Sequence, residues 1–364
     1  MNKIVVVGTR GIPNIMGGVE THVEELFPRI VKRGIDVTVI RRDKYVHDDL
    51  KEWNGVKLVD VSSPKKKSFE AIIHTWRAII KAKRLGADIV HIHAIGPAML
   101  TPVARLLGMK VVFTHHGPDY NRDKWGFAAK MMLKFGERMG CMFANDVIVI
   151  SNVIKELIAK KYNRTKRVHL IYNGVPKPDI CEYPEYFQEL GIEKGNYILG
   201  MCRFVPEKRL HDLIQAYLKV KGESASDNFP KLVLAGDTDF EDDYSLGLKK
   251  MSKENGVILT GFIKGQKLHS LLSNCRVYCL PSSHEGLPIA LLEAMSYSIP
   301  VIVSDIPANL EVGLPESDYF QMGNIDDLAQ RLKTVIIEPY NHVEYDMSKY
   351  NWDTIADQVS AIYI

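Results

Sequence analysis

The sequence predicts an α/β protein with two domains, each built around a parallel β-sheet. Short runs rich in Val and Ile alternate with longer stretches of helical periodicity, which is typical of buried parallel strands joined by crossover helices. Pro176, Pro178 and Pro184 follow the first series of elements and indicate a domain boundary. A length of 364 residues suits two domains of ordinary size, which we place at 1–175 and 176–347.

The composition excludes several classes of protein. With 46% hydrophobic and 25% charged residues the chain has a globular composition. It contains no run of about eighteen apolar residues, so we expect no membrane span. The N-terminus passes directly into a strand, without the apolar core of a signal peptide. The five cysteines are scattered, with no CxxC pair and no histidine cluster at ligand spacing, so we expect a cytoplasmic protein with reduced thiols.

The charge of the chain is divided unevenly. Residues 1–180 hold 31 Lys and Arg and 17 Asp and Glu, a net charge of +14, whereas the remaining residues hold 16 and 27, a net charge of −11. A basic half indicates an anionic membrane, lipid phosphate or nucleic acid as partner, unless its charges only solvate helix faces. The chain lacks an aromatic and basic recognition element, so we expect no nucleic acid. Lys65, Lys66 and Lys67, in a loop near Trp76, would suit an anionic bilayer, with a hydrated loop as the alternative.

The first strand, residues 4–8, leads through a loop to a helix that begins at Gly17 and Gly18. Apolar residues recur in this helix at spacings of three and four and predict one buried face, made of Val19, Val23, Leu26, Phe27, Ile30 and Val31. Two glycines at a helix start let the backbone approach a ligand closely, although a plain tight turn is the alternative. Glu20 in the first turn would complement the helix dipole.

The remaining elements of the first domain alternate in the same way. The expected strands are residues 35–40, 57–61, 88–92, 111–113, 147–150 and 168–171, and the expected helices are 69–85, 97–107, 125–143 and 153–162. Ligands bind beyond the carboxyl ends of parallel strands. His115 and His116 follow the strand that ends at Phe113 and are therefore candidates for chemistry, although a lone histidine is more often structural.

The second domain repeats the pattern. Its expected strands are residues 197–202, 231–235, 257–261, 276–280 and 301–303, and its expected helices are 210–220, 242–254, 266–273, 289–295 and 325–336. Arg203 and Lys208 follow the first of these strands and form a positive pair that could bind phosphate, with an ordinary surface pair as the alternative. The acidic run 239–243 follows an interior strand and is expected to cap a helix.

The stretch from Tyr278 to Asp305 carries the clearest signal. A strand ends at Leu280, and Gly286-Leu287-Pro288 leads into a short helix in which Pro288 suits the first position. The amides of Gly286 and Leu287 and the helix dipole would favour a phosphate. Glu285 and Glu293 lie on either side of this helix start in the sequence. Since carboxylates repel phosphate, we expect them to accept hydrogen bonds from ribose and sugar hydroxyls, unless both are merely solvated.

These motifs, in this order, resemble a known enzyme family. Glu285 and Glu293 form an E-x7-E arrangement, Arg203 and Lys208 an R-x4-K pair, and His116-Gly117 a His-Gly motif. The combination resembles retaining glycosyltransferases of the GT4 type, which have the GT-B fold. The resemblance implies two Rossmann-like domains facing a cleft. It also implies a C-terminal helix, residues 348–364, that crosses back to the first domain and that Asp353 could cap.

The resemblance implies a role for each candidate residue. Gly17 and Gly18 would lie near the donor diphosphate, which Arg203 and Lys208 would hold, and the backbone of Ile263 would meet the nucleobase. Glu285 and His116 would lie at the transferred sugar, and Glu293 at the ribose, with His115 as a supporting residue. The family transfers the sugar with retention by front-face attack, and its cations replace a metal, so we expect no metal and no cofactor.

The segment 118–126 resembles a subgroup of polysaccharide-assembly enzymes that includes rhamnosyltransferases. The expected partners are therefore a nucleoside diphosphate sugar and a glycan or lipid-linked acceptor, at a peripheral anionic membrane surface. Two other functions stay open. A sugar-nucleotide epimerase can share this architecture, and a nucleic-acid-binding or membrane-binding protein could use the basic half without catalysis. The base, the sugar and the acceptor do not follow from the sequence.

Overall fold

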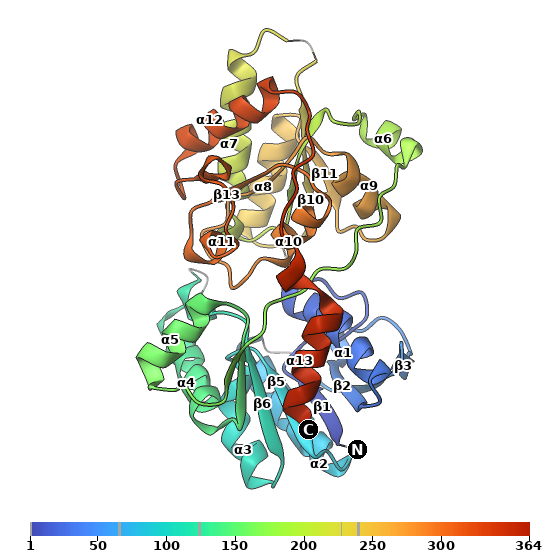
Figure 1. The fold of residues 1–364 in the computed structure, drawn as a ribbon, viewed down its shortest axis with the longest axis vertical. Coiled ribbons are helices and arrows are strands. Elements are labelled where there is room, and N and C mark those ends of the chain that lie inside the picture. Colours follow the sequence, from blue (N-terminus) through green and yellow to red (C-terminus); the bar gives the residue numbers. More distant parts are fainter. Residues whose placement is uncertain (1, 65–66, 123–124, 227, 239–240) are drawn as a thin grey trace. The chain divides into compact units, whose positions relative to one another are not determined.

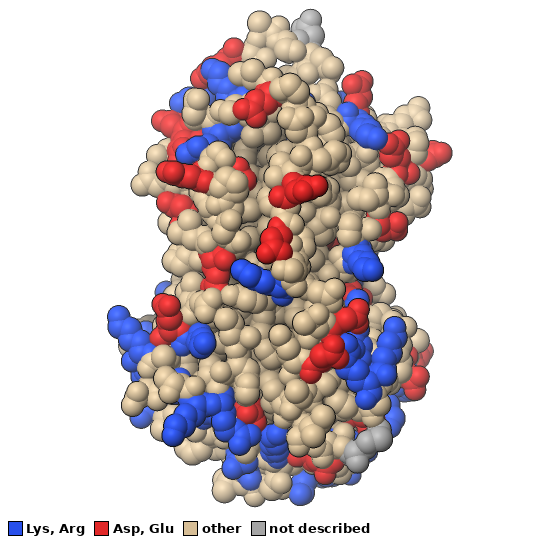
Figure 2. Space-filling model, viewed as in Figure 1, with Lys and Arg blue, Asp and Glu red and all other residues tan. Residues whose placement is uncertain are grey.

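The computed structural model describes residues 2–64, 67–122, 125–226, 228–238 and 241–364 (Figure 1). The chain forms two compact units, Met1–Gly174 with Lys349–Ile364, and Val175–Ser348. Each unit is a parallel sheet with helices, so the predicted α/β architecture is confirmed. Figure 2 shows Lys and Arg crowded over the unit that carries the N-terminus, in line with the uneven charge of the sequence.

Among the described residues, eight strands form the sheet of the first unit in the order β3-β4-β2-β1-β5-β6-β7-β8. Neighbouring strands pair in parallel except for β3 and β4. The strands are β1 (Lys3–Val7), β2 (Asp36–Arg42), β3 (Glu52–Trp53), β4 (Val56–Val61), β5 (Ile89–His93), β6 (Lys110–His115), β7 (Asp146–Val149) and β8 (Val168–Leu170). The helices are α1 (Gly18–Lys32), α2 (Lys67–Arg84), α3 (Thr101–Leu106), α4 (Phe127–Phe143), α5 (Asn152–Tyr162) and α13 (Trp352–Tyr363).

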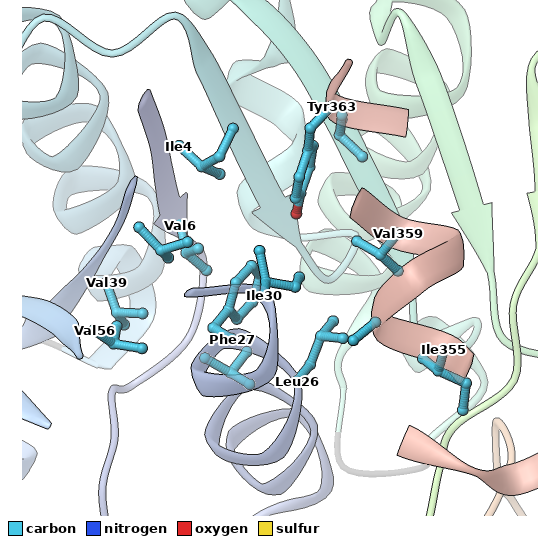
Figure 3. Packing of buried hydrophobic residues seen from close by; sticks show 14 of the residues in the cluster. Ile4, Val6, Leu26, Phe27, Ile30, Val39, Val56, Ile355, Val359 and Tyr363 are labelled. Atoms are coloured by element: carbon cyan, nitrogen blue, oxygen red, sulfur yellow. The ribbon is translucent and has the colours of Figure 1, made fainter. Parts of the chain in front are cut away.

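The C-terminal helix α13 belongs to the core of the first unit, as predicted. Ile355, Val359 and Tyr363 pack with Leu26 and Phe27 of α1 (Figure 3). This packing buries the apolar stripes of both helices, and hydrophobic burial is the main force that holds such an element in place. The prediction that Asp353 caps the helix is wrong.

The cap of α13 is Asn351, whose side-chain oxygen accepts hydrogen bonds from the backbone N–H groups of Asp353 and Thr354. A residue can satisfy the free amides of the first turn only from the position before the helix. Asp353 already lies inside that turn.

The second unit has a six-stranded sheet of described residues in the order β11-β10-β9-β12-β13-β14. Its strands are β9 (Tyr197–Met201), β10 (Lys231–Ala235), β11 (Ile258–Gly261), β12 (Val277–Leu280), β13 (Val301–Ser304) and β14 (Tyr319–Phe320). Its helices are α6 (Pro184–Leu190), α7 (Leu210–Glu223), α8 (Asp243–Glu254), α9 (Gln266–Asn274), α10 (Ile289–Ser296), α11 (Pro307–Leu310) and α12 (Ile325–Ile337). Among the described residues, no helix combines the length and apolarity that membrane crossing requires.

Some local expectations differ from the structure. Pro184, expected in a linker, starts helix α6, where proline is favoured because the first helical N–H has no intrahelical partner. Pro288 is the N-cap of α10 and not its first residue, and its carbonyl accepts from the amides of Leu291 and Leu292. Strand β6 continues to His115, because backbone pairing with β7 extends that far.

Two of the charged segments are partly outside the described residues. Asp242 caps α8 in a reciprocal pair with Ser245, as expected of the acidic run, while Asp239 and Phe240 lie outside the described residues. Lys65 and Lys66 of the basic loop also lie outside them, and Lys67 begins α2.

Candidate active site

The predicted donor-binding residues of the second unit follow adjacent strands. Strands β9 and β12 pair in parallel, with Leu199 opposite Tyr278, so their carboxyl ends lie together at one edge of the sheet. The loops that follow are joined by Ser283, whose backbone N–H donates to the carbonyl oxygen of Glu207 at 2.9 Å. Arg203 and Lys208 lie on one loop, and Glu285 lies on the other.

Lys208 and Glu285 form an ion pair across these two loops. Their side chains are only 16% and 10% exposed, so water screens the pair less than it screens a surface pair. The sequence predicted that Lys208 would bind phosphate and Glu285 would bind sugar, but it did not predict that they touch. A phosphate bound by Lys208 would therefore compete with the carboxylate of Glu285 for the ammonium group.

Cys202 follows β9 and is half-buried, and charged residues of this edge affect its thiol. Burial raises the pKa of Cys202 to about 12, Lys208 and Arg203 lower it, and Glu285 adds to the rise. Electrostatic effects of this kind fall off with distance, so Arg203, Lys208, Glu285 and also Glu207, which raises this pKa, lie in the neighbourhood of the thiol that follows β9. Arg203 is half-buried, and its loop is held to β10 by the Phe204 N–H, which donates to the carbonyl of Asp237 at 2.9 Å.

Glu293 lies on α10, near the same edge. Tyr278, the second residue of β12, is fully buried, and its phenol donates to the carbonyl of Met201 at 3.2 Å. Burial raises the pKa of this phenol well above its usual value, and the carboxylates of Glu285 and Glu293 raise it further. Both glutamates of the E-x7-E motif therefore lie in the neighbourhood of one buried hydroxyl.

The other predicted donor residues lie around this group. Gly286 and Leu287 precede the start of α10, and the side chain of Leu287 is buried. Ile263 follows the edge strand β11, so it lies past the same end of the sheet, two strands away from β9. Ile263 is half-buried.

In the first unit, Gly17 has a structural reason to be glycine. Its φ is +147°, and a Cβ there would lie 2.2 Å from Glu20 Oε2, so a side chain would be strained and would collide. Gly18 has no such constraint among the described residues, because the space around its missing Cβ is open. Of the two glycines, Gly17 is therefore the one that the local backbone and packing require.

Glu20 does more than complement the helix dipole. It is buried and pairs with Arg10 at 3.2 Å, and the Arg10 backbone N–H also donates to it at 3.1 Å. Burial acts to raise the pKa of Glu20, but Arg10 outweighs burial and the pKa is lowered. This ion pair ties the loop before α1 to the helix that follows.

Histidines from three elements meet beyond the central strands of this unit. His93 ends β5, His116 follows β6, and His22 lies on α1. A hydrogen bond of 2.9 Å joins His93 Nδ1 to His116 Nε2, and the ring centroids of His22 and His116 are 5.0 Å apart. Asn173 Oδ1 accepts from His22 Nδ1 at 3.0 Å. Only His116 was predicted, because the three residues are far apart in the sequence.

These histidines are neutral at physiological pH. Burial lowers the pKa of His22 to about 4, and it lowers the pKa values of His93 and His116 well below their usual range. His116 can therefore donate or accept a hydrogen bond but brings no positive charge. An alternating His-x-His pattern at the end of a buried strand, at His91 and His93, was the signal in the sequence that could have revealed this group.

The same three histidines could hold a metal ion. One ring nitrogen of each lies within 4.8 Å of the others, and neutral imidazole is a common zinc ligand. A metal ion bound by these histidines would replace the hydrogen bond between His93 and His116.

His115 points away from this group and supports it from behind. Its Nδ1 accepts a hydrogen bond from the Gly117 N–H at 3.1 Å, so its proton is on Nε2, which donates to Glu137 at 2.9 Å. Glu137 is buried, and it also accepts from Tyr162 and Lys161. Burial acts to raise the pKa of Glu137, but these partners lower it to about 2. His115 thus fixes the backbone beside His116.

Solved structures with the same fold are glycosyltransferases. Sucrose-phosphate synthase from Thermosynechococcus elongatus superposes with a TM-score of 0.83 over 100% of this chain and 98% of that chain, at 17% identity. The Anabaena protein HepE, solved with UDP-glucose, superposes with a TM-score of 0.73 over 99% and 94%, at 19% identity. The architecture is therefore the GT-B fold, with two parallel-sheet units and a C-terminal helix that returns to the first.

Comparison of the sequence with family profiles identifies the family of the chain. The family profile described as Glycosyltransferase Family 4 matches residues 16–177, and the profile described as Glycosyl transferases group 1 matches residues 182–351. The chain belongs to the GT4 family of glycosyltransferases, which confirms the resemblance drawn from the motifs.

The curated relatives are glycosyltransferases, and some of them have a known activity. An O-antigen chain mannosyltransferase of Salmonella typhimurium is 30% identical over 54% of this chain and 51% of that protein. An Escherichia coli enzyme that transfers galactose from UDP-Gal to α-D-GlcNAc-diphosphoundecaprenol is 27% identical over 74% and 70%. An uncharacterised glycosyltransferase of Methanocaldococcus jannaschii is 26% identical over 99% and 97%.

Proposed function

We propose that this protein is a retaining glycosyltransferase that moves a hexosyl or deoxyhexosyl group from a nucleoside diphosphate sugar to a glycan or lipid-linked acceptor in cell-surface polysaccharide assembly. The observation that carries the proposal is the group formed by Arg203, Lys208 and Glu285 around the end of β9. Two cations and a carboxylate at this edge match a ligand that has both a diphosphate and a neutral sugar.

The chemistry of transfer assigns the cations to the leaving group. When the bond between the anomeric carbon and the diphosphate oxygen breaks, both bonding electrons go to that oxygen and its negative charge grows. Arg203 can bind two phosphate oxygens at once, and Lys208 acts as a point charge beside it. Positive groups aimed at the developing charge stabilise the transition state, and a metal ion is not needed for that purpose.

Retention follows if the acceptor attacks from the face that the diphosphate leaves. The acceptor hydroxyl oxygen then forms the new bond to the anomeric carbon, and its proton passes to the departing phosphate. Glu285 has two tasks in this scheme, because it positions the sugar hydroxyls and holds Lys208 in place. Glu293 accepts from the ribose hydroxyls, and neutral His116 hydrogen-bonds the transferred sugar.

The relatives and one sequence segment support the proposed acceptor and sugar. The galactosyltransferase relative uses a diphosphoundecaprenol-linked acceptor, which supports a lipid-linked acceptor at a membrane surface. The segment 118–126, of which residues 123 and 124 lie outside the described residues, supports a deoxyhexosyl group such as rhamnosyl.

A donor screen tests this function. The protein would be incubated with UDP-, GDP- and TDP-linked sugars and a synthetic lipid-linked acceptor, and the anomeric configuration of the product would be determined by NMR. We expect one donor to be consumed with retention. Inversion would contradict the mechanism, and isomerisation of a donor in the absence of acceptor would show an epimerase instead.

A further inference from the structure

The outer face of helix α4 is apolar although it is exposed to solvent. Phe127, Met131, Phe135 and Met142 are 83%, 51%, 50% and 50% exposed. At 3.6 residues per turn these four side chains fall within about 80° of arc, so they form one stripe along the helix. Isolated exposed apolar residues are ordinary, but a continuous stripe of large ones marks a surface that binds something.

The stripe is not a sign that α4 is badly packed. The opposite face of the helix is buried through Leu133, Gly136, Glu137 and Gly140, and the helix packs against α3 and α5 (Figure 1). A Cβ on Gly136 would lie 2.1 Å from the carbonyl oxygen of Ile95, which shows how closely the inner face fits. The orientation of α4 is therefore fixed, and its apolar stripe faces outwards.

A row of basic residues accompanies the stripe. Lys130, Lys134 and Arg138 follow one another at intervals of four residues, so they lie along one side of the same helix. Glu137 is the single acidic residue within α4. It is buried, and its carboxylate is paired with its partners, so it adds no negative charge to the exposed surface. The exposed surface of α4 thus combines large apolar side chains with positive charges.

We propose that this outer face of α4 docks on an anionic lipid bilayer, with Phe127, Met131, Phe135 and Met142 inserted among the acyl chains near the headgroups. Lys130, Lys134 and Arg138 would extend to the lipid phosphates, as long basic side chains do at such interfaces. The proposal rests on the proposed function, because docking serves to bring the enzyme to a lipid-linked acceptor. Charge selects a bilayer over a second copy of the chain, since two basic faces repel each other.

This surface differs from the basic loop at residues 65–67 in one measurable respect. A purely electrostatic contact weakens as salt shortens the screening length, whereas inserted apolar side chains hold in high salt. Docking through α4 therefore predicts binding that survives 1 M salt in part.

The test is co-sedimentation with vesicles of phosphatidylglycerol and phosphatidylcholine, compared with vesicles of phosphatidylcholine alone. The variant Phe127→Ser with Phe135→Ser should weaken binding to the anionic vesicles by about tenfold or more, because two phenyl rings lose their apolar burial. The matched control is Leu310→Ser with Ile337→Ser, which removes two exposed apolar side chains from the acidic second half and should bind like wild type.

Two further measurements separate the outcomes. Unchanged circular dichroism and thermal unfolding would show that the variant is folded, and unchanged transfer to a soluble short-chain acceptor would show that the active site is intact. Equal vesicle binding by wild type and the Phe127 and Phe135 variant would overturn the proposal. So would self-association in sedimentation that the same variant abolishes, because the stripe would then be a dimer interface. Failure of the protein to transfer any sugar would overturn the proposed function. The vesicle-binding results would then test the docking of α4 independently.

Discussion

Each charged residue around the end of β9 acts through its neighbours. Lys208 and Glu285 are paired, and Arg203 lies near the same thiol, so removing one charge leaves another without its counterpart. A partly buried charge that loses its partner is costly, so substitutions at these positions are expected to affect stability as well as the proposed binding and turnover.

Arg203→Ala and Lys208→Ala are expected to lower kcat by about 100-fold or more, because each removes a positive group from the point where charge develops on the leaving diphosphate. Single-turnover rates with the preferred donor would measure this. Surface-exposed Lys250→Ala serves as a control. Rates of the two variants within a few-fold of wild type would remove both residues from the site.

The two glutamates of the E-x7-E motif should respond differently to substitution. Glu293→Ala is expected to weaken the binding of the nucleoside diphosphate, because it removes the acceptor for the ribose hydroxyls. Glu285→Ala should chiefly lower kcat, since it affects the transferred sugar and the position of Lys208. Calorimetric titration with UDP, GDP and TDP separates the effects, and unchanged affinity in Glu293→Ala would refute the ribose assignment.

The buried histidines make stability depend on pH. Their pKa values are lower in the folded protein than in the unfolded chain, so the unfolded chain binds more protons below about pH 6.5. The free energy of unfolding should therefore be constant above this pH and fall as the pH is lowered towards about 4. Urea unfolding at a series of pH values would measure the slope.

His22→Gln should reduce that slope by about 1.4 kcal/mol per pH unit, which corresponds to one proton fewer taken up on unfolding. The exposed His47→Gln is the matched control and should keep the wild-type slope. An identical slope in His22→Gln would mean that this ring is not neutral in the folded protein.

At the scale of elements, the position of α13 depends on its core contacts and on its first turn. Trp352, Ile355 and Val359 bury one face of the helix in the first unit, and Asn351 satisfies the amides at its start. Helix α13 packs in the unit that contains the N-terminus. The stability of the helix therefore contributes to the stability of that whole unit.

Asn351→Ala is expected to destabilise the first unit by about 1 kcal/mol, because two backbone N–H groups lose their acceptor. Asp353→Ala, at a residue whose side chain is 74% exposed, should have a smaller effect. Denaturant unfolding followed by circular dichroism compares the two variants. A larger loss for Asp353→Ala would restore Asp353 as the cap.

At the scale of the whole molecule, the charge is divided unevenly between the two halves of the chain. The net charge of +14 on residues 1–180 is visible as the density of Lys and Arg over the first unit in Figure 2. If the protein binds an anionic membrane as proposed, long-range attraction of this kind would raise its local concentration there, and short-range contacts would decide how firmly it stays bound.

Replacing Lys65, Lys66 and Lys67 by Ser should lower binding to anionic vesicles at 0.1 M salt and should make little difference at 1 M. The screening length falls from about 10 Å to about 3 Å over this range, so the electrostatic share of binding disappears. Donor affinity should be unchanged, and calorimetry would check it. A protein that ignores anionic vesicles at low salt would contradict the membrane association altogether.

The sequence by itself determined the parallel α/β architecture, most element boundaries and the donor motifs from Arg203 to Glu293. These features are local, because hydrophobic periodicity, turn residues and short motifs are written in neighbouring positions. Predictions from local patterns were wrong in details such as the cap at Asn351 and the helix at Pro184. At such positions several residue types suit the same role, so the sequence does not distinguish them. The family comparison agrees with the motifs, since both depend on the same local stretches.

Only the tertiary structure decided which distant residues meet. The pairing of Lys208 with Glu285, the hydrogen bond between His93 and His116, and the outward direction of the apolar stripe on α4 all depend on how strands order in a sheet. Strand order is set by packing across the whole unit and is not encoded in any short segment. The chemistry of these sites therefore follows only from the folded structure, because it depends on neighbouring residues that are far apart in the sequence.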